Sequence, residues 1–242
     1  TFQEIKGYLA ECKKFDKTCK LWWFEDEYPD HLVYLKSYWI DIFEVTNEKY
    51  LEFVKATGHR PALDSTCQTK KCREGNLWKG ESFPGRIRGQ PVTQVSWYDA
   101  DSYCRSLGNR LPTEAEWELA AKGKGDRTFP WGQERPSLAR ARYGGFETEP
   151  VSVYTVLDGA TPDGVHHMAG NAAEWVSDWW AQVLDLNGHN PTGADYGDYK
   201  VVRGGSWEDI GMDVITTARS FHSPEKGSPT IGFRCAKNLE RP

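Results

Sequence analysis

The cysteines are the residues of this chain best suited to covalent or metal chemistry. There are six among 242 residues: Cys12, Cys19, Cys67, Cys72, Cys104 and Cys235. An even number permits complete pairing, in 15 arrangements that spacing alone does not separate, and paired cysteines indicate an oxidising compartment. The alternative is a zinc site that uses the Cys67-x4-Cys72 pair, but no second Cys/His pair follows it at the spacing of a zinc finger.

The closing part of the chain holds a second group of chemically interesting side chains. Its candidates for binding a ligand or partner are Trp207, Glu208, Asp209, Phe221 and His222. Rings supply contact area while polar groups fix orientation, so this mixture is typical of a recognition site. Trp207 and the nearby Arg219 also fit buried scaffold positions, and we favour that interpretation for these two. No cysteine lies between Cys104 and Cys235, so this segment offers no thiol.

Composition limits the classes of partner. The net charge is only −5 and no long run of Lys or Arg occurs, which argues against a nucleic-acid partner. The apolar stretches are too short to span a membrane. The chain begins at Thr1 without Met or an apolar leader, so we expect an exported protein, periplasmic or extracellular, whose signal peptide was removed before Thr1.

The elements that must position these residues are short. The chain has 11 Trp, 11 Tyr and 10 Phe beside 23 Gly and 13 Pro, which favours a loop-rich body filled by large rings. β-Branched and aromatic residues predict a strand over 33–41. Capping residues and following glycines predict helices over 47–57, 96–107 and 113–122. We expect an N-terminal extension over residues 1–30 and a single domain over 31–242.

Several ordered sequence blocks identify a family. The blocks are Phe43–Tyr50, Pro91–Ala100, Arg110–Glu118, Phe129–Gly132, Met168–Trp175, and Arg203–Ser206 with Gly232–Ala236. In order and spacing they resemble the formylglycine-generating-enzyme (FGE) family, from about residue 30 to the end. The resemblance implies an α+β variant of the C-type-lectin-like fold with little regular secondary structure. It also implies a disulfide between Cys104 and Cys235, which leaves Cys12/Cys19 and Cys67/Cys72 as the remaining pairs.

The same resemblance bears on catalysis. The family's oxidases hold copper with two cysteines that follow the Arg-Gly-Gly-Ser segment, because thiolates are soft ligands for Cu(I). Here the first of those positions falls on Asp209 and the second near Val214. A carboxylate is a hard ligand, so we do not expect formylglycine-generating activity. The chain also has no His-x3-His pair of the kind used by iron-dependent relatives with this fold.

Calcium is the one cofactor that the resemblance suggests. The family often binds a structural Ca²⁺ near the Gly-Asn-x-x-Glu-Trp block, which here places Gly170, Ala172 and Glu174 as ligands. His167 stands where a side-chain oxygen is expected, and an imidazole nitrogen suits a hard cation poorly. A second family site would require a ligand at Arg142, which cannot bind a cation. We therefore expect at most one calcium ion, held by Glu174 and its neighbours.

These observations lead to one functional prediction and one alternative. The prediction is a non-catalytic FGE-like domain of an exported protein, which acts as a binding module or as an accessory subunit of a larger protein assembly. The alternative is a cysteine-independent oxidoreductase on the same scaffold, such as a maturation enzyme of a secreted metabolite. Its polar site would consist of Glu208, Asp209 and His222.

Overall fold

The computed structural model of the protein describes residues 9–10, 13, 32–62, 77–125, 127–145, 149–181 and 188–239. The predicted extension over residues 1–30 lies almost entirely outside these ranges, so its boundary stays a prediction. Of that segment, Leu9 is partly buried and packs against a hydrophobic cluster that contains Phe129 and Met212.

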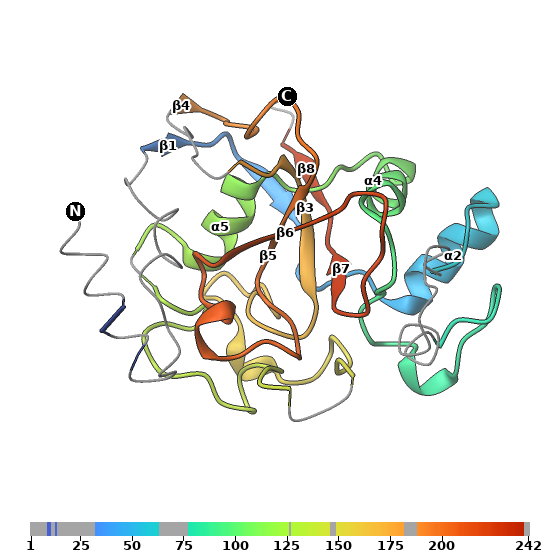
Figure 1. Ribbon diagram of the computed structural model, residues 1–242, viewed down its shortest axis with the longest axis horizontal. Coiled ribbons are helices and arrows are strands. Elements are labelled where there is room, and N and C mark those ends of the chain that lie inside the picture. The colour runs from blue at the N-terminus through green and yellow to red at the C-terminus, as the bar shows by residue number, and fades with distance from the viewer. Residues whose placement is uncertain are drawn as a thin grey trace.

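A four-stranded sheet in the order β6-β5-β3-β7 forms the middle of the molecule (Figure 1). Its strands are β3 (Ala173–Trp179), β5 (Lys200–Arg203), β6 (Arg219–His222) and β7 (Ile231–Phe233). The pairings β3–β5 and β5–β6 are antiparallel, and β3–β7 is parallel. All four residues of β5 are buried, whereas the middle of β6 is exposed. The sheet therefore has a covered centre and an accessible edge at β6.

Three helices flank this sheet, with α5 on one side and α4 and α2 on the other (Figure 1). They are α2 (Asn47–Thr57), α4 (Trp97–Ser106) and α5 (Glu114–Lys122), close to the predicted ranges. Ser96 and Thr113 begin α4 and α5 with capping boxes, and Gly58 ends α2 in the left-handed conformation. Local capping chemistry was sufficient to locate these helices.

The predicted strand over 33–41 is instead two short strands in different sheets. β1 (Val33–Tyr34) pairs in parallel with β4 (Gly188–His189), and β2 (Tyr38–Ile40) pairs with β8 (Ala236–Asn238) in antiparallel fashion. Between β1 and β2, the Lys36 amide donates to the Asn190 side chain at 2.7 Å, and this hydrogen bond stabilises the segment. Composition predicted extended backbone here but carried no information on the partners.

In the described ranges from residue 32 onward, the remaining regular elements are single 3-10 turns. They are η2 (Gly85–Ile87), η3 (Leu157–Gly159) and η4 (Gly211–Val214). The largest hydrophobic cluster in the described residues joins α2 and α4 to the sheet through Tyr50, Tyr103, Trp175 and Phe233. The predicted α+β class with little regular secondary structure is thus confirmed.

A disulfide links Cys104 at the end of α4 to Cys235 between β7 and β8, across 131 residues of sequence. Both cysteines are buried. This confirms the bridge expected from the family resemblance. Cys12, Cys19, Cys67 and Cys72 lie outside the described residues, so their pairing stays a prediction.

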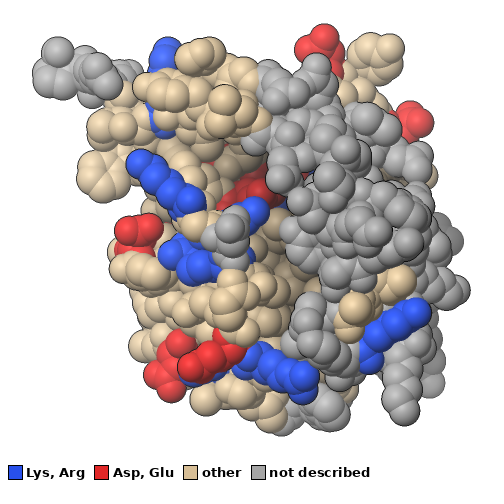
Figure 2. Space-filling view, turned by 90° about the vertical axis from the view of Figure 1, so that its left-hand side faces the viewer, with Lys and Arg blue, Asp and Glu red and all other residues tan. Residues whose placement is uncertain are grey.

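The surface shown in Figure 2 carries Lys, Arg, Asp and Glu side chains interspersed with uncharged residues over its described part. A continuous basic stripe, which a phosphate backbone would require, is not seen on the described part of this face. Within the described ranges, no helix has the length and hydropathy needed to cross a bilayer.

Candidate functional site

A pocket of about 340 Å³ lies over one face of the four-stranded sheet. Its floor is apolar and consists of Ala173, Val202 and Ile231. Strand register explains this: Ala173 is opposite Ile231, and Val202 is opposite both Trp175 and Ser220. Residues opposite one another, or two apart in a strand, share a face. All four strands therefore contribute to the same wall of the pocket.

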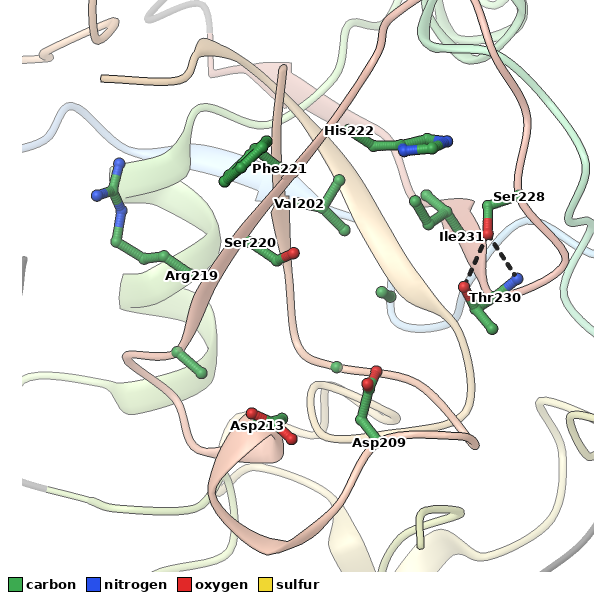
Figure 3. Close-up of a pocket in the computed structure, with 13 residues that line it drawn as sticks. Val202, Asp209, Asp213, Arg219, Ser220, Phe221, His222, Ser228, Thr230 and Ile231 are labelled. Carbon is green, nitrogen blue, oxygen red and sulfur yellow. Dashed lines mark hydrogen bonds between the residues drawn. The ribbon is translucent and has the colours of Figure 1, made fainter. Parts of the chain in front are cut away.

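β6 forms one side of the pocket, and its side chains alternate. Ser220 and His222 extend to one side of the strand, while Arg219 and Phe221 extend to the other, although all four contribute to the lining (Figure 3). The His222 ring stacks on Trp175 with ring centres 5.8 Å apart. The Phe221 ring, 47% exposed, contacts Trp180 at 4.8 Å. An aromatic group therefore flanks the strand on each face.

The other side of the pocket is the turn that follows β5, which contributes Asp209 and Asp213. Gly205 has φ +64°, and a Cβ there would lie 2.5 Å from the carbonyl oxygen of Asp213, so this close approach requires glycine. The backbone amide and hydroxyl of Ser206 donate to Asp209 Oδ2 at 2.8 and 2.7 Å. These bonds fix the Asp209 carboxylate, which Figure 3 shows directed toward the pocket.

The pocket lining contains one arginine and two aspartates. The Arg219 guanidinium binds Glu114 at 2.6 and 3.2 Å, and both side chains are nearly inaccessible. Glu114 thus pairs with this cation, and the lining also contains the carboxylates of Asp209 and Asp213. Burial, and in addition the negative charge of Glu114, raise the pKa of the Asp178 carboxyl to about 6. Hydroxyl groups of Ser220, Ser228 and Thr230 complete the polar part.

The structure brings together three of the five predicted ligand residues. Asp209, Phe221 and His222 line the pocket. Trp207 is buried, with 9% of its surface exposed, and Glu208 is exposed but outside the lining. Trp207 thus occupies the scaffold position that was also considered for it.

Sequence reasoning missed the hydroxyl residues of the lining. Ser220 lies two positions before His222 on a strand, and this alternation would have placed both on one face had the strand been recognised. Ser228 and Thr230 carry no such local signal. Arg219 is buried in its pair with Glu114, as favoured, yet it also contributes to the lining.

The residues expected to bind calcium do not fit a cation. Glu174 is buried, and both of its oxygens are used: Arg234 donates to Oε1 and Oε2 at 2.7 Å each, and the Trp117 indole donates to Oε2 at 2.8 Å. The Arg234 guanidinium already supplies the positive charge at this carboxylate. The other carboxylate beside Gly170 and Ala172 is that of Glu44, and it accepts from the Asn171 side chain and the Ala172 amide at 2.8 and 3.0 Å.

His167, which stands at the remaining ligand position, is also unsuited to this role. Its Nε2 contacts the carbonyl oxygen of Val153 at 3.0 Å. Burial first, and the charge of Arg234 in addition, lower its pKa to about 4, so the ring is neutral near pH 7. Within the described ranges, no group of three or more His, Cys, Asp or Glu side chains is arranged to hold a metal ion.

Sequence comparison places the chain among known proteins. The profile of the FGE-sulfatase family, described as the sulfatase-modifying factor enzyme 1-like domain, matches residues 10–239. The serine/threonine-protein kinase pkn1 of Chlamydia caviae is 34% identical over 229 residues, which cover 89% of this chain and 35% of that protein. The formylglycine-generating enzyme of Streptomyces coelicolor is 31% identical over 264 residues, which cover 89% of this chain and 83% of that enzyme. The chain therefore spans about a third of the chlamydial relative.

Solved structures show the same architecture. PvdO from Pseudomonas aeruginosa superposes with a TM-score of 0.73 at 25% identity and covers 88% of this chain and 85% of its own. Treponema denticola variable protein 1 superposes with a TM-score of 0.67 at 24% identity, over 86% of this chain and 87% of its own. At this identity the similarity shows the fold alone. The fold is the predicted C-type-lectin-like, FGE-type fold. With a family profile that matches nearly its whole length, the chain belongs to the FGE-sulfatase family.

Proposed function

We propose that this chain is a non-catalytic binding domain of an exported protein, which serves as a binding module or accessory subunit of a larger protein assembly. The observation that carries the proposal is the lining of the sheet-face pocket. Among the described residues, it presents carboxylates, hydroxyls, a ring and an imidazole, but no thiol. The cysteines in the described part of the chain, Cys104 and Cys235, are buried in a disulfide away from this lining.

Two further observations support this proposal. The pkn1 relatives carry the matching region as 35% of their length, which suits a domain that works as part of a larger protein. One mouse relative, 30% identical over 264 residues, is named an inactive Cα-formylglycine-generating enzyme. The Cys104–Cys235 disulfide supports an exported location, because such bonds persist in oxidising compartments.

Cysteine-independent oxidoreductase chemistry is the second candidate. It is favoured by one observation, namely that Asp209 and His222 line the same pocket. Glu208, the third residue of that predicted site, lies outside the lining. This candidate requires turnover that depends on Asp209 and His222, whereas a binding domain requires none.

The test joins an activity measurement to a binding measurement. The purified protein is incubated with copper, oxygen and a cysteine-containing sulfatase peptide, and formylglycine is sought by mass spectrometry. We expect no conversion above the protein-free control. The protein isolated from its native cells is analysed for metals and for its elution volume. Stoichiometric copper or iron would overturn the proposal, and elution as a lone monomer would exclude the accessory-subunit form of it.

A matched pair of variants then connects the assembly to the pocket. Phe221→Asp places a charge on the exposed ring at the pocket, and Tyr196→Asp does the same at a ring that is 86% exposed and outside the lining. We expect the first variant to elute as the free protein and the second to keep the native elution volume. The same elution for both variants would exclude the pocket as the contact site.

A further inference from the structure

The strand β2 bonds to β8 through every second residue. The Asp41 amide donates to the carbonyl oxygen of Cys235 at 2.9 Å. At the other end of the strand, the Leu239 amide donates to the carbonyl oxygen of Ser37 at 3.3 Å. In an antiparallel ladder, such hydrogen-bonded pairs alternate with pairs that have no hydrogen bond between them. The odd-numbered residues of this segment therefore direct their backbone groups toward β8, and the even-numbered residues direct theirs away from it.

The outer edge of β2 consequently carries the N–H and C=O groups of Tyr38 and Ile40. Within the described residues, no hydrogen bond from another segment reaches these groups. The side chains of both residues are anchored on the inner face. The Tyr38 hydroxyl donates to the carbonyl oxygen of Glu116 at 2.7 Å, and Ile40 packs against the hydrophobic cluster that contains Trp117. The edge is thus held in an extended conformation that suits pairing with a further strand.

Trp39 lies between these two residues and faces the other way. Its side chain is 65% exposed, and Lys237, which is opposite Trp39 on β8, is exposed as well. Tryptophan is enriched at the centres of protein interfaces, because its rigid ring buries a large area. The same strand therefore offers an unpaired edge and an aromatic side chain suited to a contact.

The charges that flank β2 select the orientation of a second strand. Lys36 precedes the strand and is exposed, and Asp41 follows it. If two copies of this strand paired in parallel, lysine would adjoin lysine and aspartate would adjoin aspartate. Antiparallel pairing instead brings the cationic end of each strand to the anionic end of the other. The segment is therefore complementary in charge to a second copy of itself about a two-fold axis.

We propose that the outer edge of β2 pairs with the same edge of a second copy of this chain, about a two-fold axis at Trp39. Tyr38 of each copy is then opposite Ile40 of the other, so that the free N–H and C=O groups of both edges bond to one another. The two Trp39 side chains meet in a pair without hydrogen bonds between them, where Cα atoms are about 4.5 Å apart and cross-strand rings pack closely. The result is a continuous sheet in the order β8-β2-β2-β8. This inference does not depend on the pocket or on the proposed binding function.

Analytical ultracentrifugation of the purified full chain tests the self-association. Over about 1–500 µM, the range of weak interfaces, we expect the average mass to rise from 27.5 kDa toward twice that value. Trp39→Glu removes the ring pair and places like charges opposite each other, so the dissociation constant should increase at least about tenfold. The control is Tyr98→Glu, at a ring on α4 that is 48% exposed, and it should retain the original constant. Thermal unfolding verifies that each variant is folded.

An engineered disulfide tests the register. In Trp39→Cys, the proposed two-fold pairing brings the two introduced thiols within the range of a disulfide, whose Cα atoms are usually about 4.4–6.8 Å apart. Under mild oxidation we expect a covalent dimer on a non-reducing gel. It should form at least about tenfold faster than in Tyr98→Cys, which retains all of the chain's own cysteines and so controls for their reactions.

Each part of the inference has its own contrary result. A mass of 27.5 kDa over the whole concentration range would exclude the dimer. A dimer that Trp39→Glu leaves intact would exclude β2 as the interface, and equal rates of cross-linking in the two cysteine variants would exclude the two-fold register. Phe221→Asp, at the pocket, should leave the dissociation constant unchanged. A dimer that this variant dissociates would place the contact at the pocket instead of at β2.

Discussion

The Arg234 guanidinium binds the Glu174 carboxylate at two points, Nε to Oε2 and Nη2 to Oε1, each at 2.7 Å. Both side chains are almost completely buried. Arg234 also donates to the carbonyl oxygens of Asp41, Ile42 and His166. One cation thus joins the start of β3, the end of β7 and two loops, at the place where a calcium ion was expected.

Removal of this cation should strongly destabilise the fold. Arg234→Met leaves the Glu174 carboxylate buried without its ion partner, for which a loss of about 3–5 kcal/mol in the free energy of unfolding is expected. The matched control is Arg88→Met, since Arg88 and Glu48 form an exposed pair and its loss should cost less than about 1 kcal/mol. Urea unfolding measures both, and similar losses for the two variants would contradict the importance of the buried pair.

Calcium should have no specific effect on stability, because Arg234 and Trp117 already use both oxygens of Glu174. We expect the melting temperature to be the same in EDTA and in millimolar CaCl₂. Magnesium chloride at the same concentration is the control for ionic strength. A saturable rise in melting temperature with calcium alone would show that a cation binds here or in another part of the chain, and Glu174→Gln would distinguish these two places.

The buried His167 should contribute an acid-sensitive part of the stability, which Glu44 and Asp178 oppose because burial raises their pKa values to about 8 and about 6. The pKa of this buried ring is lowered from its ordinary value of 6.5 to about 4, so the unfolded chain binds a proton between these values that the native state does not. The contribution of the neutral His167 ring to the free energy of unfolding is fully present above pH 6.5 and is lost as the pH falls toward 4. The loss from this one group is up to about 3 kcal/mol.

Urea unfolding between pH 7 and pH 4.5, in the presence of EDTA, tests this dependence. His167 has φ +57°, and His167→Asn is a suitable variant because Asn tolerates that backbone conformation. From pH 7 to pH 4.5, the difference in free energy of unfolding between the variant and the original protein should shift in favour of the variant by about 2–3 kcal/mol. His189→Asn, at an exposed histidine, should retain the slope of the original protein. An unchanged slope in His167→Asn would assign the acid sensitivity to other groups.

The Cys104–Cys235 disulfide should contribute substantially to stability. It closes a loop with a sequence separation of 131 residues, for which the chain-entropy model gives about 4–5 kcal/mol. The double variant Cys104→Ala/Cys235→Ala should lower the urea midpoint by a corresponding amount under oxidising conditions. Adding a reductant to this variant is the control for the other cysteines. A midpoint equal to that of the oxidised protein would show that packing alone holds α4 against the segment after β7.

The sequence determined the elements whose signals are local. Thr46, Ser96 and Thr113 locate the starts of the three helices, because capping is a contact between a residue and the backbone two or three positions later. The ordered family blocks determined the fold and the Cys104–Cys235 bridge. They also suggested a calcium ligand at Glu174, but the blocks do not show that an arginine 60 positions later binds that carboxylate first.

The pocket was decided by the tertiary structure alone. Asp209, His222 and Thr230 lie on three different segments, and they meet because the register of β5, β6 and β7 places Val202, Ser220 and Ile231 on one sheet face. The sequence favoured a buried position for Trp207, which has 9% of its surface exposed, but it did not show that Phe221 and Thr230 line one pocket. That arrangement depends on long-range strand pairing, for which a single sequence carries no local signal.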